Sequence, residues 1–146
     1  MSNSTKIAIG SDHAGFEQKE FLKQFLTEKG YTVTDHGTHS LDSVDYPDYS
    51  HAVANAVLDS SDTLGILLCG SGNGVCLTAN KHKGIRAALC WLPELGALAR
   101  QHNNANILCL PARYISNNSA AEITTSFLSA SFEGGRHERR VEKIDL

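Results

Sequence analysis

Leu64-Gly65-Ile66-Leu67-Leu68-Cys69 is an apolar run of strand length, and it passes directly into Gly70-Ser71-Gly72-Asn73-Gly74. A short apolar run bounded by turn residues is typical of a strand that is buried on both faces. A short helix is predicted to follow the glycine-rich loop, over about residues 75–81. This strand, loop and helix form one unit of an alternating α/β arrangement.

The same alternation extends in both directions along the chain. Further strands are predicted over residues 6–10, 31–35, 85–90 and 107–110, and further helices over residues 16–29, 49–59, 93–102, 119–130 and 135–143. Gly30 is expected to end the first helix, and Asp48 is expected to cap the second. Five strands that alternate with helices imply a doubly wound parallel sheet with helices on both faces, which is a Rossmann-like α/β fold. No linker or repeat divides the chain, so we expect residues 1–146 to form a single domain.

Composition and charge exclude several classes of protein. The 146 residues are 41% hydrophobic and 20% charged, and the net charge is −3. This composition is that of a globular domain, and a general nucleic-acid binder is more often basic. No apolar run approaches the roughly 20 residues of a membrane span, and the start of the chain lacks the hydrophobic region of a secretory signal. We therefore expect no nucleic-acid partner, no membrane association and a cytoplasmic location.

The cysteine pattern argues against a structural zinc site. The four cysteines are Cys69, Cys76, Cys90 and Cys109, and none of them forms a CxxC pair. Structural zinc sites use such closely paired cysteines. Three of the four lie in apolar, strand-like runs, which favours free thiols in a reducing compartment.

An acid and an imidazole follow the first predicted strand, as Asp12 and His13. In a doubly wound sheet, ligands bind at the carboxyl ends of the strands. The pair can therefore exchange protons or hold a hydroxylated ligand. A capping aspartate and a surface histidine are the alternative, and the residues alone leave both interpretations open.

The glycine-rich loop after Cys69 has the stronger functional pattern. Three glycines in five positions allow a ligand to approach the backbone closely, and amide groups that lead into a helix can hold an anion. A tight turn beside a core cysteine is the alternative interpretation. A Rossmann fingerprint would need glycine in place of Val75, and the Lys-Ser/Thr of a P-loop is absent. Position and glycine density favour a ligand site without a nucleotide cofactor.

Two further groups lie towards the C-terminus. His102 is suited to proton transfer, although on this stretch alone a histidine that interacts with the end of its helix is favoured. Arg136 and Arg140 are four residues apart and share one helical face. Two cations near the start of a helix need a compensating anion, and a phosphate fits an arginine fork well. A solvated basic tail is the alternative.

In combination, these segments resemble the type B ribose-5-phosphate isomerases, which are related to galactose-6-phosphate isomerase subunits. The segments that carry the resemblance are residues 10–16, 45–47, 69–74, 79–81, 84–87, 100–103 and 133–137. They are spread over nearly the whole chain, in the order that the family has. Their combination is therefore much more specific than any one of them.

The resemblance implies a role for each candidate residue. Cys69 would be the base that moves a proton between C1 and C2, and His102 would help to open the furanose ring, with Asp12 nearby. The enediolate oxygen would be held by the amides of Gly70, Ser71, Gly72, Asn73 and Gly74. The other substrate contacts would come from Ser11, from His13, Arg113, Arg136 and Arg140 around the phosphate, and from Tyr46 and Asn103 on the sugar.

One branch of the family uses a glutamate directly after the glycine loop as its base. That position is Val75 here, so the resemblance places this chain in the branch that uses cysteine. Family members are at least dimers, and each site is built from two chains. We therefore expect a homodimer or homotetramer with shared sites.

The expected activity is the interconversion of ribose 5-phosphate and ribulose 5-phosphate in the non-oxidative pentose phosphate pathway. Such an aldose–ketose isomerisation needs a base, an oxyanion hole, an acid–base group for ring opening and a phosphate anchor. It needs neither a metal nor an organic cofactor. Two alternatives stay open: an isomerase of a hexose 6-phosphate, such as allose or galactose 6-phosphate, and a non-catalytic module that binds a phosphosugar.

Overall fold

The structure is a computed structural model that describes residues 4–145. The strands within this range are β1 (Lys6–Ser11), β2 (Thr32–Asp35), β3 (Thr63–Cys69), β4 (Ala87–Leu89) and β5 (Ile107–Pro111). The helices are α1 (Phe16–Glu28), α2 (Tyr46–Asp59), α3 (Asn73–Ala79), α4 (Pro93–Asn103), α5 (Asn117–Ser129) and α6 (Arg136–Glu142), with a short 3-10 turn η1 (His13–Gly15). In this described range, no helix is both long and apolar enough to cross a membrane.

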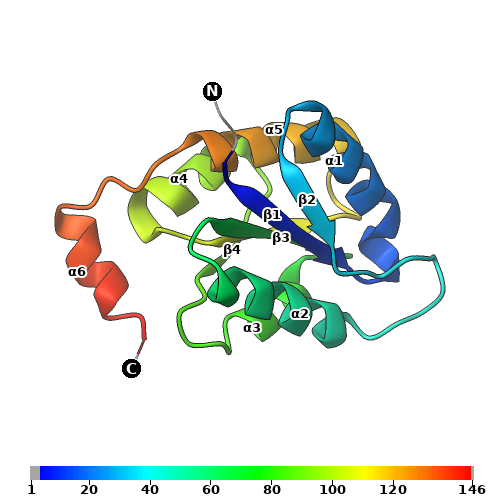
Figure 1. The fold of residues 1–146 in the computed structure, drawn as a ribbon, viewed down its shortest axis with the longest axis horizontal. Helices are drawn as coiled ribbons and strands as arrows, with labels where there is room; N and C mark the ends of the chain where they lie inside the picture. The colour runs from blue at the N-terminus through cyan, green and yellow to red at the C-terminus, as the bar shows by residue number, and fades with distance from the viewer. Residues whose placement is uncertain (1–3, 146) are drawn as a thin grey trace.

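The strands form one parallel sheet in the order β2-β1-β3-β5-β4 (Figure 1). The predicted fold class, a five-stranded parallel sheet with helices on both faces, is confirmed. The apolar run quoted first, β3, lies at the centre of the sheet between β1 and β5. This position explains why the run is apolar throughout, since helices cover both of its faces.

Alternate side chains of β3 enter two different core layers. Ile66 and Leu68 pack with residues of α1, α4 and α5 on one face of the sheet. Leu67 and Cys69 pack with residues of α2 and α3 on the other face. Because successive side chains in a strand point to opposite faces, this register sends Cys69 towards the helix that follows the glycine loop.

The second helix starts earlier than the sequence pattern predicts. Helix α2 begins at Tyr46 with Asp45 at its N-cap position, so the prediction that Asp48 caps it is wrong. Pro47 lies in the first turn, where a missing backbone N–H costs no intrahelical hydrogen bond. The early start brings Tyr46 onto the helix and close to the glycine loop.

Strand β4 is shorter than predicted because side chains take over part of its hydrogen bonding. The backbone N–H of Arg86 donates to Asn106 Oδ1 at 2.8 Å, and that of Ala87 donates to Asn80 Oδ1 at 2.8 Å. Strand β4 is at the edge of the sheet and pairs only with β5. Asn80 also donates to the Ala87 carbonyl at 2.9 Å, so its side chain bonds both backbone groups of Ala87 as a neighbouring strand would.

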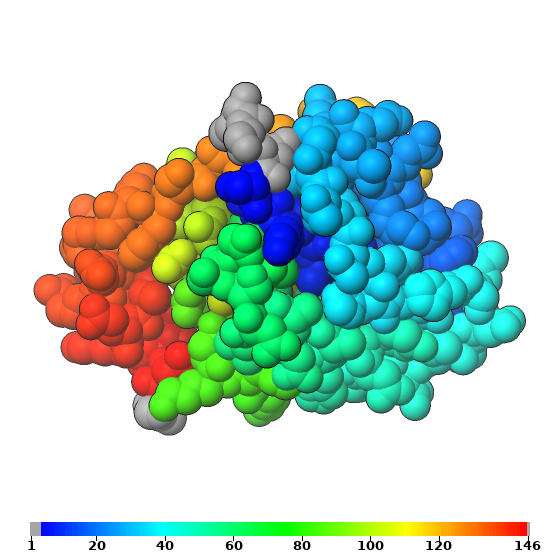
Figure 2. Space-filling view, viewed as in Figure 1, coloured from blue at the N-terminus to red at the C-terminus, as the bar shows by residue number. Residues whose placement is uncertain are grey.

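Helix α6 stands apart from the two core layers. It has no buried residue, and Figure 1 shows it beyond α4, at the side of the molecule from which the strand arrows point away. In the space-filling view, the C-terminal segment lies beside the segment that follows α3 (Figure 2). There the backbone N–H of Gly84 donates to Asp145 Oδ2 at 3.2 Å. The segment after α6 is therefore attached to the loop after α3, and most of the surface of α6 stays exposed.

Candidate active site

A pocket of about 500 Å³ opens at the carboxyl ends of the central strands. Its lining comes from the loops after β1, β3 and β5 and from the first turns of α2 and α3. The lining residues are Asp12, His13, Ala14, Tyr46, Cys69, Gly70, Ser71, Asn73, Gly74, Leu77, Arg113 and Tyr114. The structure thus brings nine of the predicted site residues into one cavity, at the end of the sheet where doubly wound folds bind ligands.

Cys69 is the last residue of β3, and its side chain is 5% exposed. Its carbonyl oxygen accepts a hydrogen bond of 2.9 Å from the Ala112 N–H, which ties the end of β3 to the turn after β5. The backbone at Cys69 is therefore held in the pocket wall. The partial burial of its side chain leaves only a small reactive face towards the cavity.

The other cysteines do not line this pocket. Burial raises the pKa of Cys90 to about 12, and burial together with the neighbouring Cys76 raises the pKa of Cys109. A hydrogen bond with Cys109 lowers the pKa of Cys76, whose sulfur is directed at Cys109 and the Ala87 carbonyl. All four cysteines are free thiols, so the sequence-based expectation of free thiols is confirmed.

The glycine loop has no room for side chains at two of its positions. Gly72 has φ +77°, and a Cβ there would lie 2.5 Å from Leu89 Cδ1 and 3.1 Å from the Leu110 carbonyl carbon. At Gly74, a Cβ would lie 2.5 Å from the ring of Tyr46. The glycines therefore let the loop pack against β5 on one side and against the tyrosine on the other. This close packing keeps the backbone of the loop at the pocket floor.

Asp12 and His13 are both fixed by local hydrogen bonds. Asp12 Oδ1 accepts from the backbone N–H groups of Ala14 at 3.0 Å and Gly15 at 3.2 Å, so Asp12 caps η1 and lines the pocket as well. His13 Nδ1 accepts from the Val44 N–H at 3.2 Å. Because Nδ1 is the acceptor, the ring carries its proton on Nε2. His13 therefore presents a hydrogen-bond donor to a ligand.

Arg113 comes from the turn after β5 and lies across the glycine loop. Its backbone N–H donates to the Gly70 carbonyl at 3.0 Å. A Cβ at Gly70 would be 3.3 Å from both Cδ and Nη1 of Arg113, so the side chain covers that glycine. Arg113 and His13 thus bring donors for an anion to the same pocket as Cys69.

Three lining residues were not predicted as site residues, namely Ala14, Leu77 and Tyr114. Leu77 and Tyr114 form part of the rim, and they are 67% and 77% exposed. No chemical motif marks them in the sequence. Leu77 lies one helical turn after Gly74, and this spacing is the only signal that could have placed it at the loop.

Two predicted residues are adjacent to the pocket but do not line it. Gly72 is buried beneath the loop, and Ser11 is buried at the end of β1. The Ser11 backbone donates to the Gly37 carbonyl and accepts from the Thr38 N–H, both at 2.8 Å. Ser11 therefore holds the loop that follows β2.

Four further predicted residues lie at the opposite end of the sheet. His102 and Asn103 end α4, just before β5 begins, whereas Cys69 is level with the last residue of β5. A strand of five residues spans roughly 13 Å between its first and last Cα. Arg136 and Arg140 are on α6, on the same side as His102 (Figure 1). Within one chain, these four residues are therefore separated from the pocket.

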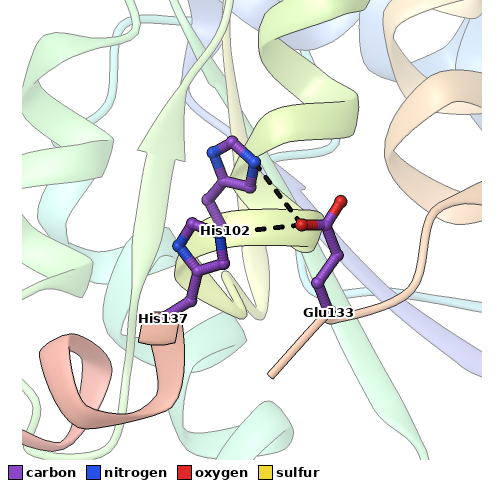
Figure 3. A group of neighbouring side chains, drawn as sticks. All are labelled: His102, Glu133 and His137. Carbon is purple, nitrogen blue, oxygen red and sulfur yellow. Dashed lines mark ion pairs between the residues drawn. The ribbon is translucent and has the colours of Figure 1, made fainter. Parts of the chain in front are cut away.

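At that opposite end, His102 belongs to a group with Glu133 and His137 (Figure 3). The two imidazole rings are stacked, with centroids 4.2 Å apart and planes 12° apart. Glu133 Oε1 lies 3.7 Å from His102 Nε2 and 3.6 Å from His137 Nε2. Partial burial, His102 and Arg136 lower the pKa of His137. Neither Glu133 nor His137 had been assigned a role from the sequence, although both lie in the last of the matching segments.

Similar proteins have been named as isomerases of small sugar phosphates. A protein of Mycoplasma genitalium, called probable ribose-5-phosphate isomerase B, is 48% identical over 97% of this chain and 94% of its own length. The D-erythrulose-4-phosphate isomerase of Pectobacterium atrosepticum is 43% identical over 94% of this chain and 91% of its own length.

Solved structures show the same fold over nearly all of the chain. A ribose 5-phosphate isomerase of Thermotoga maritima has a TM-score of 0.95 at 56% identity, over 97% of this chain and 98% of that one. The Mycoplasma genitalium ribose-5-phosphate isomerase B, solved with bound ribulose 5-phosphate, has a TM-score of 0.93 at 47% identity, over 97% and 94%. The profile of the ribose/galactose isomerase family matches residues 7–144. This chain therefore belongs to the ribose/galactose isomerase family.

Proposed function

We propose that this protein is an aldose–ketose isomerase that interconverts ribose 5-phosphate and ribulose 5-phosphate. The observation that supports this most strongly is a thiol at a strand end, Cys69, in one pocket with a glycine loop and two donors for an anion. Relatives that align over almost the whole chain carry the name ribose-5-phosphate isomerase B.

The proposed chemistry begins at C2 of the open-chain aldose. The Cys69 thiolate removes the C2 proton, the electron pair of that C–H bond forms a C1–C2 double bond, and negative charge collects on O1. Amides of residues 70–74 stabilise this enediolate, as preorganised donors do in an oxyanion hole. The thiol then returns its proton to C1, and the hydroxyl proton of O2 moves to O1. The product is the ketose, and the enzyme is restored.

The phosphate end is proposed to bind at the donors that the pocket already presents. His13 offers Nε2–H, and Arg113 offers a guanidinium that matches two phosphate oxygens. Tyr46, whose ring lies against Gly74, borders the space between this end and Cys69. Asp12 is buried beside them, with one oxygen occupied as a cap.

We further propose that a second copy of the chain completes the pocket. His102, suited to ring opening, and Asn103, Arg136 and Arg140 cannot reach the pocket of their own chain. Helix α6, which carries both arginines, has no buried residue. Large exposed apolar side chains lie at the rim of the pocket and beside it, namely Leu77, Trp91, Leu92 and Tyr114. In the proposed homodimer, the α4–α6 end of one chain covers the pocket of the other. This arrangement buries both the exposed helix α6 and the exposed apolar rim, and two such dimers give a tetramer.

A phosphosugar of different length is the second candidate substrate. A relative that covers 94% of this chain is named for a four-carbon sugar phosphate, and the family profile is named for galactose as well as ribose. The same base and oxyanion hole serve any of these sugars, because the reacting atoms C1 and C2 are identical. The number of carbons in the sugar therefore distinguishes the candidate substrates.

A coupled assay separates these candidates. The purified chain is given ribose 5-phosphate, allose 6-phosphate, galactose 6-phosphate and D-erythrulose 4-phosphate, each in the presence of EDTA. We expect the highest kcat/KM with ribose 5-phosphate. A higher kcat/KM with another sugar would transfer the assignment to that sugar. Calorimetric binding of ribulose 5-phosphate without turnover of any of the four would identify a binding module.

A further inference from the structure

Three side chains that metals commonly use as ligands meet between the end of α4 and the start of α6. They are His102, Glu133 and His137, and they lie outside the Cys69 pocket (Figure 3). We propose that they form a binding site for a borderline divalent transition metal, Zn²⁺ above all. All three ligands come from one chain.

The spacing of the donor atoms fits such an ion. One donor atom from each residue lies within 4.8 Å of the other two, and Glu133 Oε1 is 3.7 and 3.6 Å from the two Nε2 atoms. These separations are too long for hydrogen bonds. Tetrahedral ligands of a Zn²⁺ ion with bonds of about 2.0–2.1 Å are about 3.4 Å apart. Side-chain rotations that turn the two rings out of their parallel stack bring the three donor atoms around one ion.

The backbone holds the ligands in place. The Glu133 N–H donates to the Gln101 carbonyl at 3.0 Å, which ties the glutamate to the residue before His102. The His137 N–H donates to the Gly134 carbonyl at 3.1 Å. The His137 side chain is 12% exposed and its ring is stacked on that of His102. In Figure 3, both dashed lines meet at one oxygen of Glu133, so a single carboxylate oxygen faces the two imidazole nitrogens.

The ligand types select the metal. Two imidazoles and one carboxylate are a ligand set that zinc enzymes use, with a fourth position left for water. Mg²⁺ and Ca²⁺ prefer sites made of oxygen ligands alone. Arg136 and Arg140 add positive charge near His137, so Coulomb repulsion weakens the binding of a cation. We therefore expect a site of moderate affinity that loses its metal to a chelator.

The consequence for turnover rests on the proposed function. A metal bound to His102 Nε2 occupies the nitrogen that ring opening would use, so Zn²⁺ acts as an inhibitor and not as a cofactor. If a second chain places His102 over a bound sugar phosphate, substrate and Zn²⁺ compete for that residue. Inhibition is then relieved by EDTA and by high substrate concentration.

Calorimetry with ZnCl2 tests the site directly. Binding is measured on the full chain with Cys69→Ala and Cys76→Ala, so that the pocket-lining thiol and the partly exposed one do not bind the ion, whereas turnover is measured on the chain with both cysteines intact. We expect about one Zn²⁺ per chain, no comparable heat with MgCl2, and at least a tenfold loss of affinity in Glu133→Gln and in His137→Gln. The matched control is His51→Gln, because His51 and His82 form another exposed histidine pair, with Nδ1 and Nε2 2.7 Å apart. This control is expected to keep the affinity for Zn²⁺.

The possible results test the proposed metal site independently of the proposed isomerase function. Unchanged affinity in both Glu133→Gln and His137→Gln, or loss of binding in His51→Gln, would overturn the proposal. Circular dichroism confirms that each variant is folded before its affinity is compared. A chain that isomerises ribose 5-phosphate in EDTA but binds no Zn²⁺ at this site contradicts the metal site alone. A chain that binds Zn²⁺ there but isomerises no sugar phosphate contradicts the proposed function alone.

Discussion

Cys69 differs from the other cysteines in its surroundings, because it alone ends a central strand at a cavity that also holds anion donors. Cys90 and Cys109 are buried with raised pKa values, so both stay protonated at neutral pH. Cys76 is one residue beyond the position of Val75, yet its sulfur is directed at the Ala87 carbonyl. The proposed role of Cys69 in proton transfer can therefore be tested one cysteine at a time.

Replacing Cys69 with alanine is expected to lower kcat for ribose 5-phosphate by about 10²–10⁴-fold, because removal of a general base has that effect. Because Cys69 is buried, the loss of its sulfur should lower the thermal midpoint by only a few degrees and leave the variant folded. Steady-state kinetics and thermal unfolding of the same preparation check both statements. The matched control is Cys76→Ala, which is expected to keep kcat within a few-fold. A Cys69→Ala variant that folds and keeps wild-type turnover would assign proton transfer to another residue.

Gly72 and Gly134 both have positive φ, but only Gly72 is packed against other residues. At Gly134, with φ +69°, an added Cβ meets nothing within 4 Å. Gly134→Ala is therefore expected to cost about 1 kcal/mol of backbone strain alone. Gly72→Ala adds the clash with Leu89 and the Leu110 backbone, which typically costs a further 1–3 kcal/mol. Denaturant unfolding of the two variants measures the difference, and equal free energies of unfolding would show that the loop relaxes freely.

Residue types and spacing were enough to predict most of the pocket but not its limits. Asp12, His13, Cys69 and the glycine loop could be predicted because each lies at or directly after the end of a strand. Leu77 and Tyr114 carry no such signal, since their place in the rim depends on how α3 and the turn after β5 pack. The roles of Cys69 and His102 stay predictions.

At the scale of elements, the contact of α1 with β2 contains a buried charge network. The Lys19 side chain is fully buried on α1, and its Nζ lies 2.6 Å from Asp35 Oδ2 on β2. Lys23 Nζ lies 2.7 Å from the same oxygen. Asp35 Oδ1 accepts from the Gly37 N–H at 2.8 Å. The network thus joins a helix, a strand and the loop that supports Ser11 and His13.

This network predicts how the free energy of unfolding depends on pH in the acidic range. Partial burial raises the pKa of Asp35, but hydrogen bonds from Lys19, Lys23 and the Gly37 amide outweigh it and lower the pKa from 3.8 to about 2. Because the folded-state pKa is the lower one, the carboxylate stabilises the fold above pH 4 by about 2 kcal/mol. That contribution is lost as the pH falls from about 4 to about 2.

Asp35→Asn is expected to remove this acid-dependent step and to destabilise the fold at pH 7 by about 3–5 kcal/mol, since it removes one partner of a buried ion pair. Chemical unfolding between pH 2 and pH 7 measures both effects. The control is Asp42→Asn, because Asp42 is exposed in the loop after β2. An Asp35→Asn variant with the wild-type pH profile would show that Asp35 titrates normally.

Elements were easier to predict than their boundaries and their order. Apolar runs and helical periodicity indicated each strand and helix, but the first turn of α2 and the ends of β4 depend on Pro47 and on two asparagine side chains. The exchange of β4 and β5 in the sheet order leaves no mark in the sequence. Lys19 was not singled out either, because its pairing with Asp35 appears only when α1 packs on β2.

At the scale of the whole molecule, the proposed partner contribution leads to a mixing experiment. Cys69→Ala removes the base, and the double variant Arg136→Ala, Arg140→Ala removes the phosphate contacts of α6. Each is expected to be nearly inactive alone. After subunit exchange in equal amounts, about a quarter of all sites combine an intact Cys69 with intact arginines, because half of the dimers are mixed and each has one such site.

Native mass spectrometry verifies the exchange, and turnover of ribose 5-phosphate is then measured. The control mixes Cys69→Ala with wild type inactivated at the same residue by alkylation, which cannot complement. Verified exchange without recovery would place the arginines in the same site as the Cys69 of their own chain, or outside the site altogether.

In the proposed dimer with shared sites, the separation of Cys69 from α6 by the length of the sheet also has a genetic consequence. A subunit that carries all three changes, Cys69→Ala, Arg136→Ala and Arg140→Ala, spoils both sites of any dimer that it joins. Expressed beside an equal amount of normal subunit, it leaves about a quarter of the catalytic capacity, whereas self-contained sites would leave about half. The defective allele is therefore dominant over the normal one, although it encodes a protein that does nothing by itself.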